Sequence, residues 1–293
     1  MTYKQAKSVL ITDLDNTLFD WFDIWCATFK PLLEKTSEVS GIDRKILIDE
    51  IRPIHQKHGT AEYAFVLEEI PSLLKKYGNR ERILSEFSEA IHAARSNRIK
   101  HLKLYKGVYD TLAELRSKRV RVIAYTESKE WYTKFRLKRL GLDFFIEKVY
   151  SPGDHVKLPI DDSKRTDIVF DNIEFRKTPK DELKPNPKLL LDIIKDAGVD
   201  KDECVYIGDS EIKDIDMAHE AGVSSVFAKY GTSHFEERPD DYNLLRAVTH
   251  WTDEVVQREK DLKESALNHK ADFEIDNFSE LLNLFDFKRL HKQ

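Results

Sequence analysis

The sequence predicts an α/β protein: a doubly wound parallel sheet joined to a smaller, all-helical domain. From Lys106 onward, short buried strands alternate with amphipathic helices at the spacing of right-handed βαβ units. One further buried strand, SVLITDLD, lies far upstream at residues 8–15. Between these parts, from about Phe19 to His101, the periodicity is helical throughout. We therefore expect an α/β core of residues 1–18 and 105–293, and a helical domain of residues 19–104.

The upstream strand is a continuous apolar run that ends in acidic residues, as expected for a parallel strand covered on both faces. In the helical domain, Asp43 should be the N-cap of a helix that Pro53 ends or kinks. Helical spacing recurs at residues 61–70 and 79–94. This domain is therefore predicted to contain helices alone.

The α/β part shows four helices and four strands in alternation. The expected helices are residues 107–119, 129–142, 185–199 and 212–223, and the expected strands are residues 120–126, 147–151, 204–209 and 224–231. Domains of this type hold their chemistry in loops beyond the carboxyl ends of the strands. Functional residues are therefore expected at those strand ends.

Two segments fall outside the alternation. The insert at residues 152–183 is polar, with candidate strands at 167–170 and 173–176. The C-terminal extension, residues 236–293, contains a charged helical stretch at 257–270 and then, at 271–285, a short edge strand and an amphipathic helix. The pattern assigns no role to the insert.

Composition narrows the class of protein. The chain has 293 residues and a net charge of −5, whereas a nucleic-acid groove needs a strongly basic stripe. No apolar run approaches the roughly 20 residues that cross a bilayer, and the N-terminus has no signal-peptide pattern. Its two cysteines, Cys26 and Cys204, lack the spacing of a metal site or a disulfide framework. We expect a cytoplasmic protein that binds neither nucleic acid nor membrane; its oligomeric state stays open.

The first strand ends in Asp13-Leu14-Asp15-Asn16-Thr17, with two acids two residues apart. Neighbouring carboxylates repel each other, and a divalent cation such as Mg²⁺ relieves that repulsion. One carboxylate can then attack phosphorus, because aspartate forms acyl phosphates, and the other can exchange a proton with the leaving oxygen and with water. The alternative is a solvated acidic turn after a strand.

A second acidic loop follows the strand at residues 204–209. Gly208 permits a tight turn, and Asp209 stands where a metal ligand would. Asp214 is placed to support Asp209 or a metal-bound water. Asp214 also suits the N-terminal turn of a helix, where the dipole favours an acid, and both roles are compatible.

Two further residues supply donors for a phosphate. The strand at 120–126 ends in Thr126, and Lys184 precedes a helix in Leu183-Lys184-Pro185-Asn186-Pro187. A lysine near two carboxylates and a phosphate would offset their charge and hold phosphoryl oxygens in the transition state. Taken singly, such residues usually belong to a turn or a solvated surface.

Together, in this order, these elements resemble the four motifs of the haloacid dehalogenase (HAD) superfamily. DLDNT is similar to motif I, Thr126 to motif II, Lys184 to motif III, and GDSEIKD at residues 208–214 to motif IV. The likeness covers about residues 6–20 and 104–235, and the helical block between motifs I and II resembles the family's C1-type cap domain. It implies a HAD-like Rossmannoid core with a helical cap.

The resemblance also implies roles for the acids. Asp13 would be the nucleophile and a Mg²⁺ ligand, and Asp15 the general acid and base whose backbone carbonyl also binds the metal. Asp209 would ligate Mg²⁺ directly, with Asp214 in support. Because Asp15 is present, a reaction that protonates an alkoxide leaving group is favoured over expulsion of chloride.

Thr126, Glu127 and Lys184 would bind the transferring phosphoryl group. Many relatives have Asn where this chain has Glu127, so we expect its backbone N–H to serve and its side chain to turn away. Because the insert is long, Lys177 and Lys180 are rival candidates for the motif III role. The Pro-Asn-Pro and the helix that follow Lys184 favour that residue.

The predicted function is a Mg²⁺-dependent phosphatase that hydrolyses a small phosphate monoester through an aspartyl-phosphate. The alternatives are a phosphomutase of the same superfamily and a catalytically silent binding or regulatory relative. Within the helical domain, Arg52, His55 and His58 are either a basic cluster for an anionic substrate or a solvated helix face. The substrate itself cannot be read from the sequence.

Overall fold

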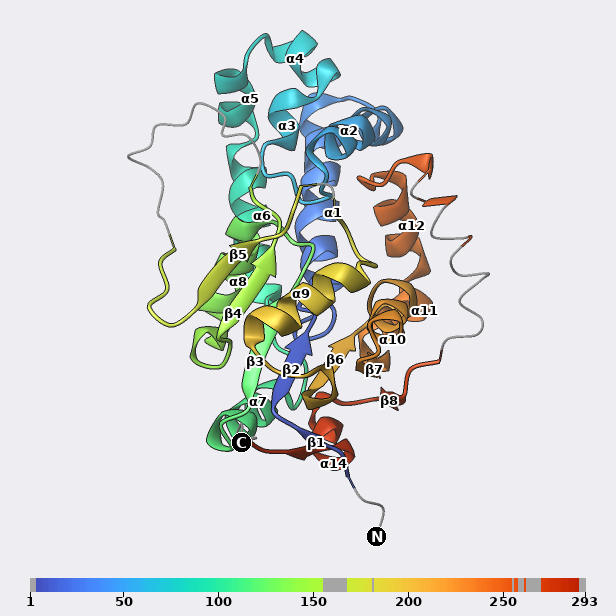
Figure 1. Ribbon diagram of the computed structural model, residues 1–293. Helices are drawn as coiled ribbons and strands as arrows, with labels where there is room; N and C mark the ends of the chain where they lie inside the picture. Colours follow the sequence, from blue (N-terminus) through green and yellow to red (C-terminus); the bar gives the residue numbers. More distant parts are fainter. Residues whose placement is uncertain are drawn as a thin grey trace. The chain divides into compact units, whose positions relative to one another are not determined.

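A computed structural model describes residues 4–154, 168–180, 182–254, 256–257, 261 and 270–289 (Figure 1). The chain divides into two compact units. The α/β unit comprises Met1–Asp20, Lys103–Ser233 and Leu262–Gln293, and the helical unit comprises Trp21–Leu102 and His234–Asp261. The sequence assigned the whole C-terminal extension to the core. The structure instead groups residues 234–261 with the helices, because this segment adds a helix to their hydrophobic core.

A seven-stranded sheet forms the centre of the α/β unit. Its strands are β2 (Val9–Thr12), β3 (Arg121–Tyr125), β4 (Lys148–Ser151), β5 (Glu174–Lys177), β6 (Cys204–Gly208), β7 (Ser224–Ala228) and β8 (Phe273–Ile275). They lie in the order β5-β4-β3-β2-β6-β7-β8, and every pairing is parallel. The chain thus builds outward from central β2 in both directions, which confirms the predicted doubly wound α/β fold.

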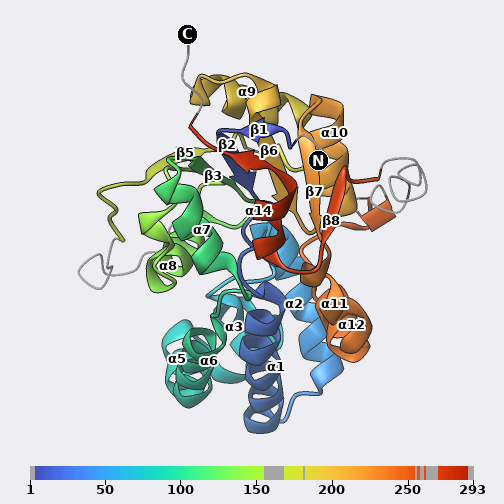
Figure 2. The ribbon, with the colours of Figure 1, turned by 90° about the horizontal axis from the view of Figure 1, so that it is seen from below.

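Helices cover both faces of this sheet. On one face lie α7 (Val108–Ser117) and α8 (Glu130–Arg139), and on the other lie α9 (Pro187–Ala197) and α10 (Met217–Ala221) (Figure 2). The second face is a hydrophobic cluster in which Leu190 and Ile193 of α9 and Met217 of α10 pack on the central strands. Since both faces are buried, the central strands are mostly apolar, as the sequence pattern predicted.

Shorter elements complete the α/β unit. They are the helical turns η1 (Leu142–Phe144), η3 (Lys201–Glu203), η4 (Glu211–Asp216, a π-helix), η5 (Lys229–Gly231) and η7 (Phe278–Glu280), the helix α14 (Leu281–Leu284), and the paired strands β1 (Ala6–Lys7) and β9 (Asp286–Phe287). The edge strand and helix expected in residues 271–285 are β8 and η7 with α14.

The insert is only partly described. Its second candidate strand, at residues 173–176, corresponds to β5. Of the first, at 167–170, residue 167 lies outside the described residues, and residues 168–170 are not a strand. Most of the charged stretch at 257–270 also lies outside the described residues.

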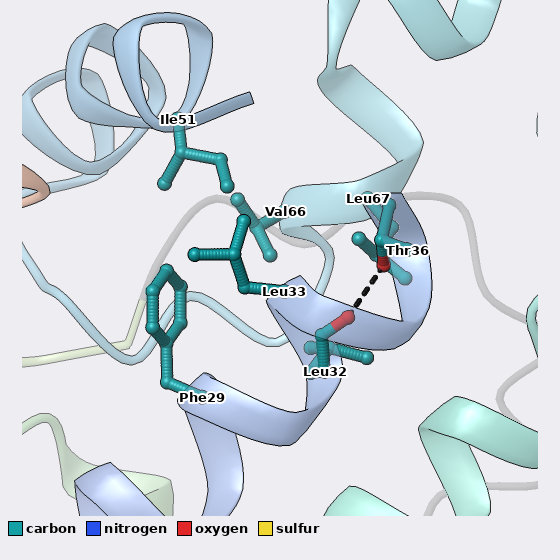
Figure 3. Close-up of a pocket in the computed structure, with 7 residues that line it drawn as sticks. All are labelled: Phe29, Leu32, Leu33, Thr36, Ile51, Val66 and Leu67. Carbon is teal, nitrogen blue, oxygen red and sulfur yellow. Dashed lines mark hydrogen bonds between the residues drawn. The ribbon is translucent and has the colours of Figure 1, made fainter. Parts of the chain in front are cut away.

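The described helices of the helical unit bury a core of their own. They are α1 (Trp21–Ser40), α2 (Arg44–His58), α3 (Val66–Glu69), α4 (Pro71–Tyr77), α5 (Arg80–Glu86), α6 (Ser88–His101), α11 (Ser233–Glu237) and α12 (Pro239–Ala247). Phe22, Trp25 and Phe29 of α1 lie at its centre. A cavity of about 10 Å³ remains within the helical unit. It is lined by seven side chains: Phe29, Leu32, Leu33, Thr36, Ile51, Val66 and Leu67 (Figure 3). Its polar group, the Thr36 hydroxyl, donates to the Leu32 carbonyl at 2.7 Å, so the cavity offers little to a ligand.

Helix α2 begins where the sequence predicts and continues past its internal proline. Asp43 is the predicted N-cap of α2, and its carboxylate accepts from the Lys45 N–H at 2.7 Å. Pro53 does not end α2, which continues to His58 because Ile51 and Ile54 are buried on either side of it. Such burial offsets the roughly 3 kcal/mol that an internal proline costs.

The stretch at residues 61–70 is helical only at α3. Its Tyr63 lies in the preceding turn, stacked on His58 at 3.7 Å, and donates to Glu69. No helix among the described residues has the length and apolar character needed to span a membrane.

Candidate active site

The loop after β2 starts beside the carboxyl end of β6. Asp13 follows the last residue of β2, and its backbone N–H donates to the Ile207 carbonyl at 2.9 Å. The loop then turns tightly through Asn16, whose φ of 57° lies in the left-handed region. Asp13 is buried, whereas the side chain of Asp15 keeps 21% of its surface exposed. The two acids therefore have different surroundings.

Lys184 lies between two acids. Its ammonium donates to Asp13 Oδ1 at 2.6 Å and to Asp214 Oδ1 at 2.9 Å, and it lies over the rings of Tyr125 and Tyr206. Burial lowers the pKa of Lys184, but the two carboxylates outweigh this effect and hold its pKa well above the ordinary value. The lysine is thus a fixed positive charge in the site.

Asp209 directly follows β6, and Asp214 lies in η4, the helical turn that comes next. Asp214 Oδ1 also accepts from the Tyr206 hydroxyl at 2.8 Å, and its Oδ2 accepts from the Ser210 N–H at 3.1 Å. Gly208 makes this possible, because a Cβ there would lie 2.2 Å from Asp214 Cγ. Backbone bonds to a carboxylate of this kind fix its direction, so Asp214 has little freedom to turn.

The acids are close enough to share a cation. One carboxylate oxygen from each of Asp13, Asp209 and Asp214 lies within 4.8 Å of the others. Burial raises the pKa of Asp13 to about 8 against the opposing Lys184, and burial together with Asp13 and Asp214 holds that of Asp209 well above its ordinary value. Such crowding is what a hard cation relieves, and an all-oxygen donor set fits Mg²⁺.

A second glycine brings two of the loops together. A Cβ on Gly231 would lie 2.0 Å from the Asn16 carbonyl oxygen and 2.9 Å from Asp209 Cβ. The neighbouring Tyr230 hydroxyl donates to the Thr17 carbonyl at 2.7 Å. The segment after β7 therefore closes the site on the side of the loop from Asp13 to Thr17.

The motif II loop lies on the other side, after β3. The Thr126 hydroxyl accepts from the Ser128 N–H at 3.1 Å. The Glu127 carboxylate accepts from the Lys184 backbone N–H at 2.9 Å and from Lys213 Nζ at 2.8 Å. Burial opposes ionisation of Glu127, but Lys213 and Lys184 outweigh it and lower the pKa of Glu127. Its negative charge thus interacts with the segment before α9, through Lys184, and with η4, through Lys213.

The other residues that the sequence offered for substrate binding differ from Lys184 in their exposure or in their contacts. Lys177 and Lys180, the rivals of Lys184, are exposed, and Lys177 approaches Glu130 at 3.9 Å. The basic cluster at Arg52, His55 and His58 does not form a single exposed face. His55 is buried with its Nδ1 2.7 Å from the Val248 carbonyl, and burial lowers its pKa to about 4.

These loops bring an ordered set of acids and one lysine to the carboxyl ends of β2, β3 and β6. Residues 7–222 match the family model described as haloacid dehalogenase-like hydrolase. The chain belongs to this family. A second model, for HAD-like hydrolases, matches residues 183–281.

A curated protein and two solved structures are also similar to this chain. A glyceraldehyde 3-phosphate phosphatase from Methanopyrus kandleri is 29% identical over 156 residues, which are 52% of this chain and 55% of that protein. The chain therefore matches about half the length of this curated relative. A 2-haloacid dehalogenase structure from Pseudomonas syringae shares the fold, with a TM-score of 0.55, 18% identity, and coverage of 95% of this chain and 97% of that one.

A HAD hydrolase structure from Bacillus subtilis, bound to magnesium, also shares the fold. Its TM-score is 0.52 and its identity 14%, and the match covers 96% of this chain and 99% of that one. At these identities the two structures support the fold alone.

Some residues of this HAD-like site had no separate signal in the sequence. Tyr206 lies inside a buried strand, and Lys213 was one charge among several in a helical pattern. Ser128 and Arg136, which bond Asp15, were equally inconspicuous. Their roles depend on contacts between different elements of the fold, and periodicity within one segment does not report such contacts.

Proposed function

We propose that this HAD-family hydrolase is a Mg²⁺-dependent phosphatase that hydrolyses a small phosphate monoester through an aspartyl-phosphate on Asp13. The observation that carries the proposal is the bond from Lys184 Nζ to Asp13 Oδ1 at 2.6 Å, beside the carboxylates of Asp209 and Asp214. A buried lysine that touches the attacking carboxylate can also hold a phosphoryl oxygen that arrives there.

The chemistry divides among the acids. Asp13 attacks phosphorus, and the bond from phosphorus to the leaving oxygen breaks. Asp15 gives its proton to that oxygen, then takes one from the water that attacks the aspartyl-phosphate and frees Asp13. Thr126, Lys184 and the backbone N–H of Glu127 bind the phosphoryl oxygens throughout.

The carboxylates of Asp13 and Asp209 and the backbone carbonyl of Asp15 would hold Mg²⁺, with Asp214 in support. The cation would supply charge that offsets the acids and the phosphoryl oxygens. Lys184 already offsets part of this charge for Asp13 and Asp214. The cation and Lys184 would be complementary, because the three carboxylates carry more negative charge than a single ammonium can offset.

Two observations favour a phosphatase over a dehalogenase. Expelling a halide needs no acid, whereas Asp15 is present, with an exposed part of its side chain, in the motif I loop. The relative from Methanopyrus kandleri is, by its name, a phosphatase of a small phosphorylated metabolite. We infer a substrate of that class. We also assign to the helical unit, which follows motif I in the chain, the role of a C1-type cap that selects it.

The test follows phosphate release from p-nitrophenyl phosphate and from a panel of metabolite phosphates with Mg²⁺. We expect turnover in the wild type, with at least a thousandfold loss in Asp13→Asn and with EDTA. Asp192→Asn is the matched control, since it makes the same change at an exposed acid on α9 and should keep full activity.

A second readout is thermal unfolding with and without Mg²⁺. A ligand present at about 100 times its Kd stabilises the native state by about 2.7 kcal/mol. We expect this gain in the wild type and in Asp192→Asn, but not in Asp209→Asn. An isomerised product without phosphate release would indicate a mutase, and binding without turnover across the panel would indicate a silent relative; either result contradicts the proposal.

A further inference from the structure

Arg136 of α8 is a buried arginine that reaches the motif I loop. Its side chain is only 2% exposed, and its Nη1 donates to Asp15 Oδ1 at 3.0 Å. The guanidinium also lies 5.7 Å from the ring centre of Phe19 and 5.4 Å from that of Tyr132. Aromatic faces of this kind hold a guanidinium in one orientation. Arg136 is therefore a fixed charge directed at Asp15.

Ser128 holds the other oxygen of the same carboxylate. Its hydroxyl donates to Asp15 Oδ2, and the same hydroxyl accepts from Arg136 Nη1 at 3.0 Å. Ser128 is itself fixed, because its N–H donates to the Thr126 hydroxyl and its carbonyl accepts from the Thr133 hydroxyl. The two Asp15 oxygens are thus bonded to two rigidly held donors, which form a clamp.

Stability alone is a poor explanation for this clamp. Replacing a buried ion pair with apolar residues of similar volume is often neutral or stabilising. The Asp15 side chain also keeps 21% of its surface exposed, while Arg136 behind it is closed off. The clamp therefore holds the carboxylate from behind and leaves a face of it open. A carboxylate oxygen carries two lone pairs, so accepting one hydrogen bond does not by itself prevent its protonation.

We propose that Arg136 and Ser128 are positioning residues that hold Asp15 in line for proton transfer. The inference rests on the proposed phosphatase activity. In the first step the Asp15 proton moves to the leaving oxygen as its bond to phosphorus breaks. In the second, a water proton moves to Asp15 as water oxygen bonds phosphorus and the bond to Asp13 breaks. Neither positioning residue gains or loses a proton.

The experiment compares Arg136→Met with Arg139→Met, which makes the same change at an exposed position on the same helix. The substrates are p-nitrophenyl, phenyl and p-methoxyphenyl phosphate, which are similar in shape but leave with increasing need of a proton. General acid catalysis contributes about 10²–10⁴-fold. We expect kcat/KM of Arg136→Met, which reports the step that releases the leaving group, to fall about tenfold further for p-methoxyphenyl than for p-nitrophenyl phosphate.

Three further variants keep the inference testable if Arg136→Met is unstable. Arg136→Lys should recover part of the loss, and Ser128→Ala should show a smaller loss with the same dependence on the leaving group. In an Asp15→Asn background, Arg136→Met should add no further dependence, because its effect acts through Asp15.

Equal losses of kcat/KM for all three esters, or a full additional loss in the Asp15→Asn background, would overturn the positioning role while leaving the phosphatase assignment intact. A wild type that hydrolyses none of the esters and none of the metabolite panel would instead overturn the proposed function, and this inference with it. The two failures are therefore distinguishable.

Discussion

At the scale of single residues, the site depends on the absence of one side chain. Asp214 occupies the space where a Cβ of residue 208 would be, and three donors hold it there: Tyr206, Ser210 and Lys184. Because Lys184 also bonds Asp13, a displaced Asp214 would move the lysine that the proposed nucleophile needs. The geometry of the whole acidic cluster is thus sensitive to one methyl group.

Gly208→Ala tests this sensitivity. Forcing a methyl group into a filled site costs about 1–3 kcal/mol of unfolding free energy, and we expect a loss of that size with at least a tenfold fall in kcat. Gly153→Ala is the control, since a Cβ there meets Lys177 at an ordinary 3.6 Å. Urea unfolding and steady-state kinetics measure both effects. Equal behaviour of the two variants would show that Asp214 can move without consequence.

At the scale of elements, α9 fixes the residues that precede it. Asn186 is its N-cap and accepts from the Leu189 N–H at 2.9 Å, and Pro187 occupies the first turn. Leu190 and Ile193 anchor the helix to the sheet. Lys184 lies two residues before the cap, so the start of α9 fixes the position of the backbone that carries the lysine side chain. The sequence signal Pro-Asn-Pro is therefore also a positional signal for the site.

Asn186→Ala should lower the unfolding free energy by about 0.5–2 kcal/mol, because an N–H of the first turn loses its acceptor. Asn186→Asp keeps a cap acceptor and should lose much less. Urea denaturation of both variants beside the wild type measures the difference. If both lose the same amount, the cap bond contributes nothing and α9 is held by its packing alone.

The strands β3 and β6 and the helix α3 show which part of the fold could be predicted from the sequence. β3 and β6 are short apolar runs with turn residues after them, so both their existence and their end were visible in the sequence. A helix was expected over residues 61–70, but its restriction to α3 was not visible in the sequence. Tyr63 follows the helical spacing, yet it lies in a turn, where it stacks on His58 and donates a hydrogen bond to Glu69. Tertiary contacts overrode the local preference there.

The candidate site likewise contains residues that the sequence could predict and residues that it could not. Asp13 and Asp209 stand at strand ends, and a parallel sheet brings such ends to one edge, so their proximity followed from the pattern. Arg136 did not, because its bond to Asp15 joins residues 121 positions apart and its helix is rich in charges. Only a packed structure distinguishes a buried charge from a solvated one on such a helix.

At the scale of the molecule, two buried histidines make stability depend on pH. Burial lowers the pKa of His55 to about 4, and burial with a smaller contribution from Arg238 does the same for His234. Both belong to the helical unit. The folded chain therefore keeps them neutral at a pH where the unfolded chain, with a histidine pKa near 6.5, binds protons.

We expect the unfolding free energy to fall as the pH drops from about 6.5 toward 4, by up to about 1.4 kcal/mol per pH unit for each histidine. Above pH 6.5 neither group contributes. Tryptophan fluorescence during urea unfolding suits the measurement, since Trp21, Trp25 and Trp251 belong to the helical unit. His55→Gln and His234→Gln should each reduce the slope; an unchanged slope in both would contradict this origin.

The central place of β2 has a consequence for biosynthesis. This strand is translated before both of its neighbours in the sheet, β3 and β6, which are encoded more than a hundred residues later. At the speed of a ribosome, about 5–20 residues per second, an apolar strand waits on the order of ten seconds for its first partner. The helical unit is also incomplete until residues 234–261 appear. Nascent chains of this protein therefore carry an apolar segment without a strand partner until β3 has been made, and chaperones that bind short apolar stretches would meet it before the sheet can form.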